Sequence, residues 1–229
     1  VTNADLISHE IINNSLEKLT PDIPILSEES SNISYEKRRS WDRYWLIDPL
    51  DGTKEFIKQN GEFTVNIALI VNHEPYIGVI NAPVIKKVYW GHKKDGSHMQ
   101  SSDGSVSKLR VSKTIGEMRR IAISRSHKSI ELKSYLSRIK KYKEIGIGSS
   151  LKFCLVANND ADYYPRFGPT SEWDTAAGQA ILESAGGSVL LLSGETLKYN
   201  LKKTFINPPF FAINNSFDKY NLLKEAVSP

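Results

Sequence analysis

The sequence predicts a mixed α and β protein built from two halves, an α+β half followed by an α/β half. In the first half, short apolar segments are separated by polar turns, which favours antiparallel strands joined as hairpins. From about Arg119, short apolar segments alternate with helical patterns, which is typical of crossover connections between parallel strands. The boundary is expected within residues 112–118, giving halves of residues 1–115 and 116–229.

The first half opens with a predicted helix, because apolar residues recur at helical spacing: Leu6, Ile7, Ile11, Leu16 and Leu19. Thr2 and Asp5 form a capping pair at its start, and Pro21 and Pro24 end it. Strands are then expected at residues 25–26, 44–47, 63–71, 76–81, 87–91 and 108–111. The third and fourth of these form a hairpin, and a turn at residues 94–96 precedes the last.

The second half is expected to alternate strands with helices. Strands are predicted at residues 121–123, 144–148 and 161–165. Helices are predicted at residues 129–139, 149–157 and 173–185, and Gly186-Gly187 stops the last one. No internal repeat or low-complexity segment interrupts this order.

Composition indicates an ordinary globular protein. The 229 residues are 40% hydrophobic and 24% charged, and the net charge is +4. The basic residues are scattered, which argues against a nucleic-acid partner but suits an anionic small substrate. The lone cysteine, Cys154, lies among apolar residues, so we expect a buried thiol, no internal disulfide and a reducing cytosol. The five histidines show no zinc spacing. No signal peptide or apolar span is visible, so a soluble, cytoplasmic protein is expected.

The most informative segment is Asp48-Pro49-Leu50-Asp51-Gly52-Thr53, which is expected to be a turn at the end of the apolar 44–47 strand. It places two carboxylates three residues apart next to a buried strand. Burying two acids close together is costly unless cations neutralise them. A divalent metal is the obvious partner.

Other acids are ambiguous from the sequence alone. Glu28 ends a short strand as Asp48 does, but taken alone its sequence context favours an exposed acidic loop. Asp174 and Asp5 could be helix caps or site acids. Thr53 could cap the segment 54–57, or its hydroxyl could polarise a water molecule.

The chain resembles the inositol monophosphatase-like, magnesium-dependent and lithium-sensitive phosphatases. Three segments carry this resemblance in a fixed order: Leu26-Ser27-Glu28-Glu29, Trp45-Leu46-Ile47-Asp48-Pro49-Leu50-Asp51-Gly52-Thr53 and Trp173-Asp174-Thr175-Ala176-Ala177-Gly178. Further segments make it most similar to the bacterial 3'(2'),5'-bisphosphate nucleotidases: residues 51–57, 60–69, 124–127, 148–154 and 164–170. The resemblance covers almost the whole chain.

The resemblance implies a layered α/β/α/β/α sandwich of the sugar-phosphatase type, with most metal ligands in the first half. It implies two or three Mg²⁺ ions held by Glu28, Asp48, the carbonyl of Leu50, Asp51 and Asp174. Asp5 and Thr53 would orient and deprotonate the attacking water, and the amides of Gly52 and Thr53 would bind the scissile phosphate. The same comparison places Ser124, His127, Ser149, Lys152 and Arg166 around the nucleotide. His127 as a helix cap and Arg166 as a structural pair are the alternatives.

The implied activity is Mg²⁺-dependent hydrolysis of 3'-phosphoadenosine 5'-phosphate (PAP) to AMP and phosphate, as in sulfur assimilation. It extends to the 5'-phosphosulfate analogue PAPS. An inositol monophosphatase, or a truncated PAP-binding module without catalysis, is the alternative. The implied state is a monomer or homodimer with no obligate protein partner, cytoplasmic, with peripheral attachment to the inner membrane left open. The family pattern begins with a helix and a hairpin before the segment matching residues 2–5, so we expect either a sequence that is a fragment or a protein that lacks this helix and hairpin. All metal-binding positions are present, so a functional site is expected.

Overall fold

The first sheet contains seven strands in sequence order, β1 to β7. The computed structural model describes residues 2–114, 116–126 and 128–227. All neighbouring strands in this sheet are antiparallel except β1 and β2, which are parallel. The strands are β1 (Ile25–Ser27), β2 (Arg43–Asp51), β3 (Thr64–Val71), β4 (Glu74–Ala82), β5 (Lys87–His92), β6 (Gly96–Gln100) and β7 (Val106–Leu109).

The second sheet contains five strands in the order β11-β12-β10-β8-β9. Strands β10, β8 and β9 are parallel, while β12 is antiparallel to both of its neighbours. These strands are β8 (Arg119–Ser124), β9 (Tyr142–Ile147), β10 (Tyr163–Arg166), β11 (Gly187–Leu191) and β12 (Phe210–Asn214). The parallel core agrees with the crossover pattern predicted for the second half.

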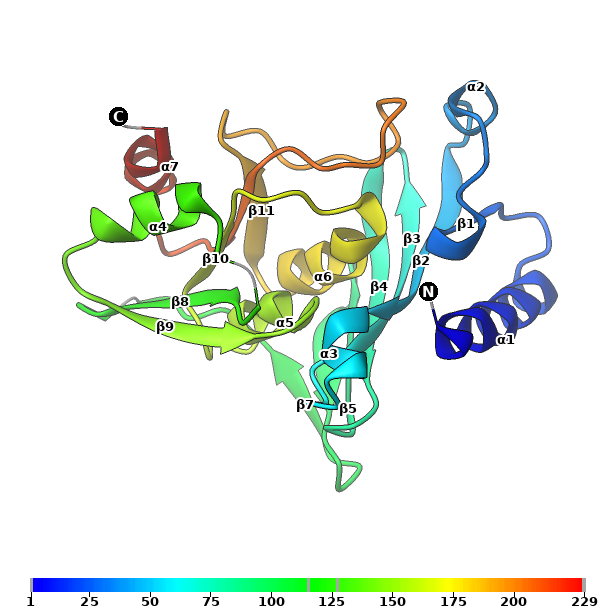
Figure 1. Cartoon of the computed structure of the whole chain (residues 1–229), viewed down its shortest axis with the longest axis horizontal. Helices are drawn as coiled ribbons and strands as arrows, with labels where there is room; N and C mark the ends of the chain where they lie inside the picture. The colour runs from blue at the N-terminus through cyan, green and yellow to red at the C-terminus, as the bar shows by residue number, and fades with distance from the viewer. Residues whose placement is uncertain (1, 115, 127, 228–229) are drawn as a thin grey trace.

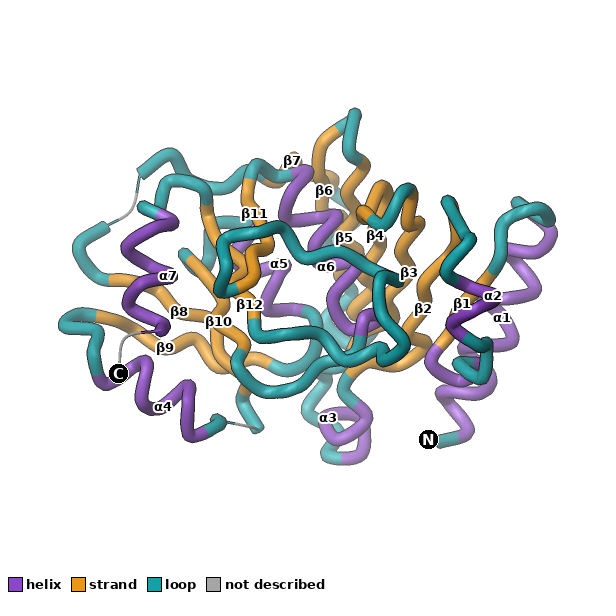
Figure 2. The backbone as a smooth tube through the Cα atoms, turned by 90° about the horizontal axis from the view of Figure 1, so that it is seen from above, coloured by secondary structure: helices purple, strands orange, loops and turns teal. Residues whose placement is uncertain are grey.

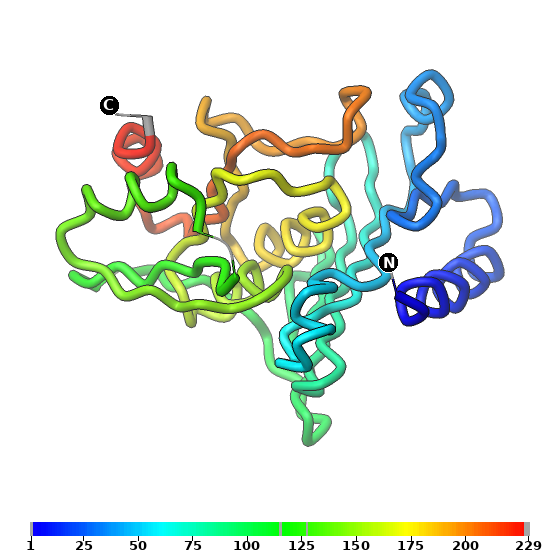
Figure 3. Tube along the Cα trace, viewed as in Figure 1, coloured from blue at the N-terminus to red at the C-terminus, as the bar shows by residue number. Residues whose placement is uncertain are grey.

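The helices and sheets form five layers (Figures 1 and 2). Helix α1 (Asn3–Leu19) lies outside the first sheet, and α5 (Leu151–Ala157) and α6 (Glu172–Ser184) fill the space between the sheets. Helices α4 (Ile130–Ser137) and α7 (Lys219–Val227) cover the outer face of the second sheet. Two short helices, α2 (Tyr35–Arg38) and α3 (Thr53–Ile57), and a 3-10 turn (Glu28–Ser30) flank the first sheet. The predicted α/β/α/β/α sandwich is therefore confirmed. Colour by residue number shows the blue N-terminal and red C-terminal helices at opposite ends (Figure 3).

Helix α6 lies directly on the first sheet because glycines face it. A Cβ atom on Gly78 would lie 2.4 Å from the carbonyl oxygen of Ala177, and one on Gly91 would lie 2.6 Å from Cα of Ile181. The helix contributes small residues to the same contact, including Ala177 and Ala180. This close packing fixes the start of α6, where Asp174 lies.

The segment that contains Asp48 and Asp51 is not the turn that the sequence predicted. Strand β2 continues through Asp51, and its pairing with β3 is irregular between Asp48 and Asp51. Pro49 has no amide hydrogen, so it cannot complete a regular ladder. The bulge allows two acids on one strand to be displayed together.

The helix predicted at the N-terminus is confirmed, but most of its apolar residues are exposed rather than part of the core. In α1 only Asp5 and Leu16 are buried, and Ile7, Ile11 and Leu19 are 57%, 63% and 75% exposed. Cys154 is buried, as predicted. No helix in the described part of the chain is long and apolar enough to cross a membrane.

Candidate active site

Four acids from three elements converge at one end of the first sheet. Glu28 follows β1, Asp48 and Asp51 end β2, and Asp174 lies in the first turn of α6. Ser27 is in parallel register with Ile47, so Glu28 and Asp48 follow at adjacent positions. Their carboxyl groups interact with each other, and Asp48 also interacts electrostatically with Asp51 and Asp174. The structure thus brings together the four acids predicted as metal ligands.

Burial of this cluster favours protonated carboxyls in the absence of a cation. Asp48 is 1% exposed, and burial together with the charge of Asp51 raises its pKa well above the usual range. Burial likewise raises the pKa of Asp51 and of Glu28, with Glu29 adding to the latter. Burial and the neighbouring Asp51 raise the pKa of Asp174 to about 8. Such a cluster needs positive charge to remain ionised at neutral pH.

The donor set suits Mg²⁺, because it consists of oxygen atoms only. Within residues 2–114, 116–126 and 128–227, no three His, Cys, Asp or Glu side chains are placed so that they alone could hold a metal ion. An open arrangement is compatible with an ion that keeps several waters and is bound together with substrate phosphate. The residues present therefore fit Mg²⁺ held jointly by protein, water and substrate.

Asp5 and Asp174 both form helix caps, so the two alternatives considered for them are not exclusive. The amide and hydroxyl of Thr2 both donate to Asp5 Oδ2 at 2.6 Å, and the amide of Ser171 donates to Asp174 Oδ2 at 2.8 Å. Each aspartate is the third residue of its helix and completes a capping box. Asp5 is buried and electrostatically close to Glu28. Capping holds each carboxylate in place beside the cluster.

Gly52 begins the short helix α3, in place of the cap predicted for Thr53. Gly52 is the N-cap and adopts a left-handed conformation with φ +90°, which favours glycine. Thr53 is the first helical residue. Among the described residues its hydroxyl has no hydrogen-bond partner. The side chain remains available for water or substrate.

A buried polar network behind Asp51 was missed by the sequence analysis. Asn66 Oδ1 accepts hydrogen bonds from the hydroxyls of Ser150, at 2.7 Å, and Thr64, at 3.1 Å. Its amide nitrogen faces Asp51 Oδ2 at 3.5 Å, which fixes the amide orientation. Thr64 and Asn66 alternate on an otherwise apolar strand, and this pairing on one face was the available signal.

Lys152 is buried at the start of α5, beside the acid cluster. Its Nζ donates to the carbonyl of Ser149 at 2.5 Å and lies 5.3 Å from the centre of the Tyr164 ring. Burial lowers the pKa of Lys152 to about 8, although Asp51 opposes this shift. Lys152 shares a cavity of about 140 Å³ with two of the four acids, Asp51 and Asp174. Gly52, Ser124, Ser149 and Arg166 also line it. Its walls therefore contain most of the predicted phosphate and nucleotide contacts.

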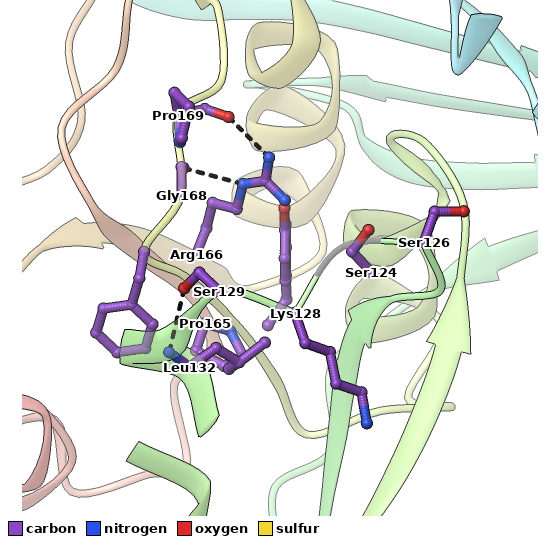
Figure 4. A pocket seen from close by; sticks show the side chains of 11 residues that line it. Ser124, Ser126, Lys128, Ser129, Leu132, Pro165, Arg166, Gly168 and Pro169 are labelled. Atoms are coloured by element: carbon purple, nitrogen blue, oxygen red, sulfur yellow. Dashed lines mark hydrogen bonds between the residues drawn. The ribbon is translucent and has the colours of Figure 1, made fainter. Parts of the chain in front are cut away.

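A larger cavity of about 560 Å³ shares Ser124, Tyr164 and Arg166 with the first. The start of α4, with Lys128 and Ser129, forms one wall, and the loop after β10 forms the other (Figure 4). Arg166 donates to the carbonyls of Gly168, at 3.1 Å, and Pro169, at 2.7 Å, so the structural pairing considered for it is present. His127 lies outside the described residues.

Comparison with known proteins identifies the class of protein. A model of the inositol monophosphatase family matches residues 1–224, so the chain belongs to the inositol monophosphatase family. The resemblance expected from the sequence and the predicted fold are both confirmed.

Within this family, the chain is similar to nucleotidases named CysQ. The chain is 50% identical to the 3'(2'),5'-bisphosphate nucleotidase CysQ of Salmonella typhimurium over 210 residues, which are 92% of this chain and 83% of that protein. It is 48% identical to CysQ of Escherichia coli K12 with the same coverage. The crystal structure of CysQ from Bacteroides thetaiotaomicron is 40% identical, with a TM-score of 0.82, and covers 91% of this chain and 82% of that chain.

Proposed function

We propose that the chain is a Mg²⁺-dependent 3'(2'),5'-bisphosphate nucleotidase that releases the 3'-phosphate of PAP, giving AMP and phosphate. The observation that carries the proposal is a pair of neighbouring cavities that share Ser124, Tyr164 and Arg166 in their walls. One contains Asp51 and Asp174 of the acid cluster, and the other, of about 560 Å³, is large enough for a nucleoside. The identity with the CysQ nucleotidases supports the same reaction. PAPS, which has the same 3'-phosphate, is a second substrate on this account.

Glu28, Asp48, the Leu50 carbonyl, Asp51 and Asp174 would hold two or three Mg²⁺ ions. Bound Mg²⁺ would supply charge neutralisation and polarisation of the scissile phosphate. The protein residues then have separate tasks. Asp5 and Thr53 orient the attacking water, and Asp5 accepts its proton. The amides of Gly52 and Thr53 hold phosphate oxygens as charge moves toward the leaving 3'-oxygen.

We assign specificity for a bisphosphate to two cationic side chains of the cavity, Lys152 and Arg166. Lys152 and Arg166 both line the acid-containing cavity, and Arg166 also lines the larger one. An ammonium and a guanidinium are the groups that bind a second, uncleaved phosphate. Ser124 and Ser149 add hydroxyl contacts near the sugar. Inositol monophosphate has no second phosphate for these two side chains to bind.

The test compares phosphate release from PAP and from inositol 1-phosphate at the same Mg²⁺ concentration. We expect the higher kcat/KM with PAP. A higher value with inositol 1-phosphate would assign the inositol ester as substrate. Tight PAP binding by calorimetry, with no phosphate release at any Mg²⁺ concentration, would instead identify a binding module without catalysis.

A further inference from the structure

Glu62 connects the two halves of the molecule beside the site. It lies between α3 and β3, and its carboxylate forms a fork with Arg125 from the loop after β8. Arg125 Nε donates to Oε2 at 2.8 Å and Nη2 donates to Oε1 at 2.7 Å. Glu62 Oε2 also accepts the amide of Gly148, after β9, at 2.8 Å. One carboxylate therefore holds two loops of the second sheet.

Glu55 makes a parallel connection from α3. Its Oε1 accepts the hydroxyl of Ser126 at 2.6 Å, and the side chain is buried. Arg125 Nη2 further donates to the carbonyl of Gly146 at 2.7 Å, which ties the loop after β8 to the end of β9. These contacts surround Ser124 and Ser149, which line the proposed substrate cavity.

The loops meet without spare room at this point. A Cβ atom on Gly148 would lie 2.7 Å from the carbonyl oxygen of Glu62 and 2.8 Å from Cγ of Glu55. A Cβ atom on Gly52 would lie 3.3 Å from Cβ of Ser149. The loop containing Gly52 and the loop containing Ser149 are thus in direct contact, and the Glu62 bonds lie at their junction.

We propose that Glu62 is a positioning residue that sets the spacing between the phosphate-binding loop 51–53 and the nucleotide-binding loop 149–152. This inference rests on the proposed function. The Glu62–Arg125 pair is 53% exposed on the arginine side, and an exposed pair of this kind adds only about 0–1 kcal/mol to stability. Its main effect is therefore expected in the alignment of the substrate between the two loops.

A bisphosphate nucleotide must contact both loops at once, whereas a small phosphate monoester needs only the acid cluster and loop 51–53. Misplacement of about 1 Å between reacting groups can cost roughly 100-fold in rate. Loss of the Glu62 hydrogen bonds should therefore impair PAP hydrolysis much more than hydrolysis of p-nitrophenyl phosphate. A role in folding alone would affect both substrates equally.

The test uses Glu62→Gln, Arg125→Gln and the double variant in the full chain. Glu74→Gln is the matched control, because Glu74, at the start of β4, forms an exposed ion pair with Lys93, which follows β5. We expect kcat/KM for PAP to fall about 10- to 100-fold in Glu62→Gln. The value for p-nitrophenyl phosphate should change far less, and the double variant should be no worse than Glu62→Gln. Equal losses on both substrates, additive losses in the double variant, or no loss would overturn the proposal.

Amide hydrogen exchange provides a readout that does not depend on activity. Glu62→Gln should accelerate exchange at residues 124–126 and 146–150, and Glu74→Gln should not. If the wild type fails to hydrolyse PAP, the proposed function fails, and this measurement still decides the role of Glu62. Unchanged exchange in those loops would overturn that role. If Glu62→Gln does not fold, Arg125→Gln serves in its place, because it removes the fork and leaves the bond to Gly148.

Discussion

Glu28 and Asp48 lie side by side and their carboxyl groups interact, although 20 positions separate them in the chain. The parallel pairing of β1 with β2 produces this contact, because Ser27 and Ile47 are in register. Two carboxyls this close cannot both remain ionised without a cation nearby. The pairing of β1 with β2 therefore places two acids where a cation is needed to keep both of them ionised.

The first prediction concerns Asp48, which is 1% exposed at the centre of the cluster. Asp48→Asn removes a charge that Mg²⁺ would neutralise, while preserving the side-chain volume. Several kcal/mol of charge stabilisation should be lost, so kcat should fall roughly 100- to 1000-fold. The increase in Tm on adding Mg²⁺ should also shrink. The measurement is phosphate release together with thermal unfolding with and without Mg²⁺, and a full response in the variant would contradict the assignment.

The second prediction concerns the network behind Asp51. Asn66→Ala leaves the hydroxyls of Thr64 and Ser150 without their shared acceptor. We expect the free energy of unfolding to fall by about 1–3 kcal/mol, because two buried hydroxyls, which still contact each other at 2.8 Å, lose their shared acceptor. Activity at saturating Mg²⁺ should fall as well, because Asp51 loses its orienting neighbour. Urea unfolding and phosphate release measure the two effects, and a variant with unchanged stability would refute the importance of the network.

The third prediction concerns the position of α6. Gly78→Ala places a methyl group 2.4 Å from the Ala177 carbonyl, so the helix must shift. Overpacking of this kind typically costs about 1–3 kcal/mol of unfolding free energy. The shift also moves Asp174, so kcat should fall. Gly116→Ala is the control, because nothing lies within 4 Å of its Cβ position. Equal stability in the two variants would contradict this account of the packing.

The fourth prediction concerns Glu183 near the end of α6. Burial raises its pKa to about 7, and Gln179 donates to Oε1 at 2.9 Å. A raised carboxyl pKa favours the folded state while the group is protonated. This stabilisation is complete below pH 4.5 and is lost as the pH rises through about 7.

Glu183→Gln keeps the shape and cannot ionise, so it provides the test. Between pH 5 and 8 the wild type should lose on the order of 2–3 kcal/mol more unfolding free energy than the variant. Urea unfolding at several pH values measures this difference. Parallel pH profiles for the two proteins would show that Glu183 titrates normally.

The sequence predicted those helices and strands whose apolar residues recur at one regular spacing. The 63–71 and 76–81 hairpin and the 173–185 helix appear close to their expected bounds as β3, β4 and α6. Strands β6, β11 and β12 and helix α7 were not predicted, although β12 is wholly buried and lies between two other strands of the second sheet. Its burial depends on distant partners that flank it on both sides, and a local pattern does not reveal them.

Residues of the candidate site were likewise predictable only where they form a local sequence pattern. The segment Asp48–Thr53 was recognisable because its acids end an apolar strand, but the bulge that displays them depends on pairing with β3. The exposed apolar residues of α1 show the converse, since helical period alone predicted the helix and not its burial. Glu62 and Asn66 carry no local signal as site residues, because their contacts lie more than 80 positions away in Gly148 and Ser150.

The central claim is that the acid cluster binds Mg²⁺ for hydrolysis of a bisphosphate nucleotide. The most direct measurement is phosphate release from PAP as a function of Mg²⁺ concentration, for the wild type and Asp51→Asn. The wild type should release phosphate only with Mg²⁺, and Asp51→Asn should be nearly inactive at every concentration. Activity of the wild type after complete chelation, or full activity of Asp51→Asn, would contradict the account.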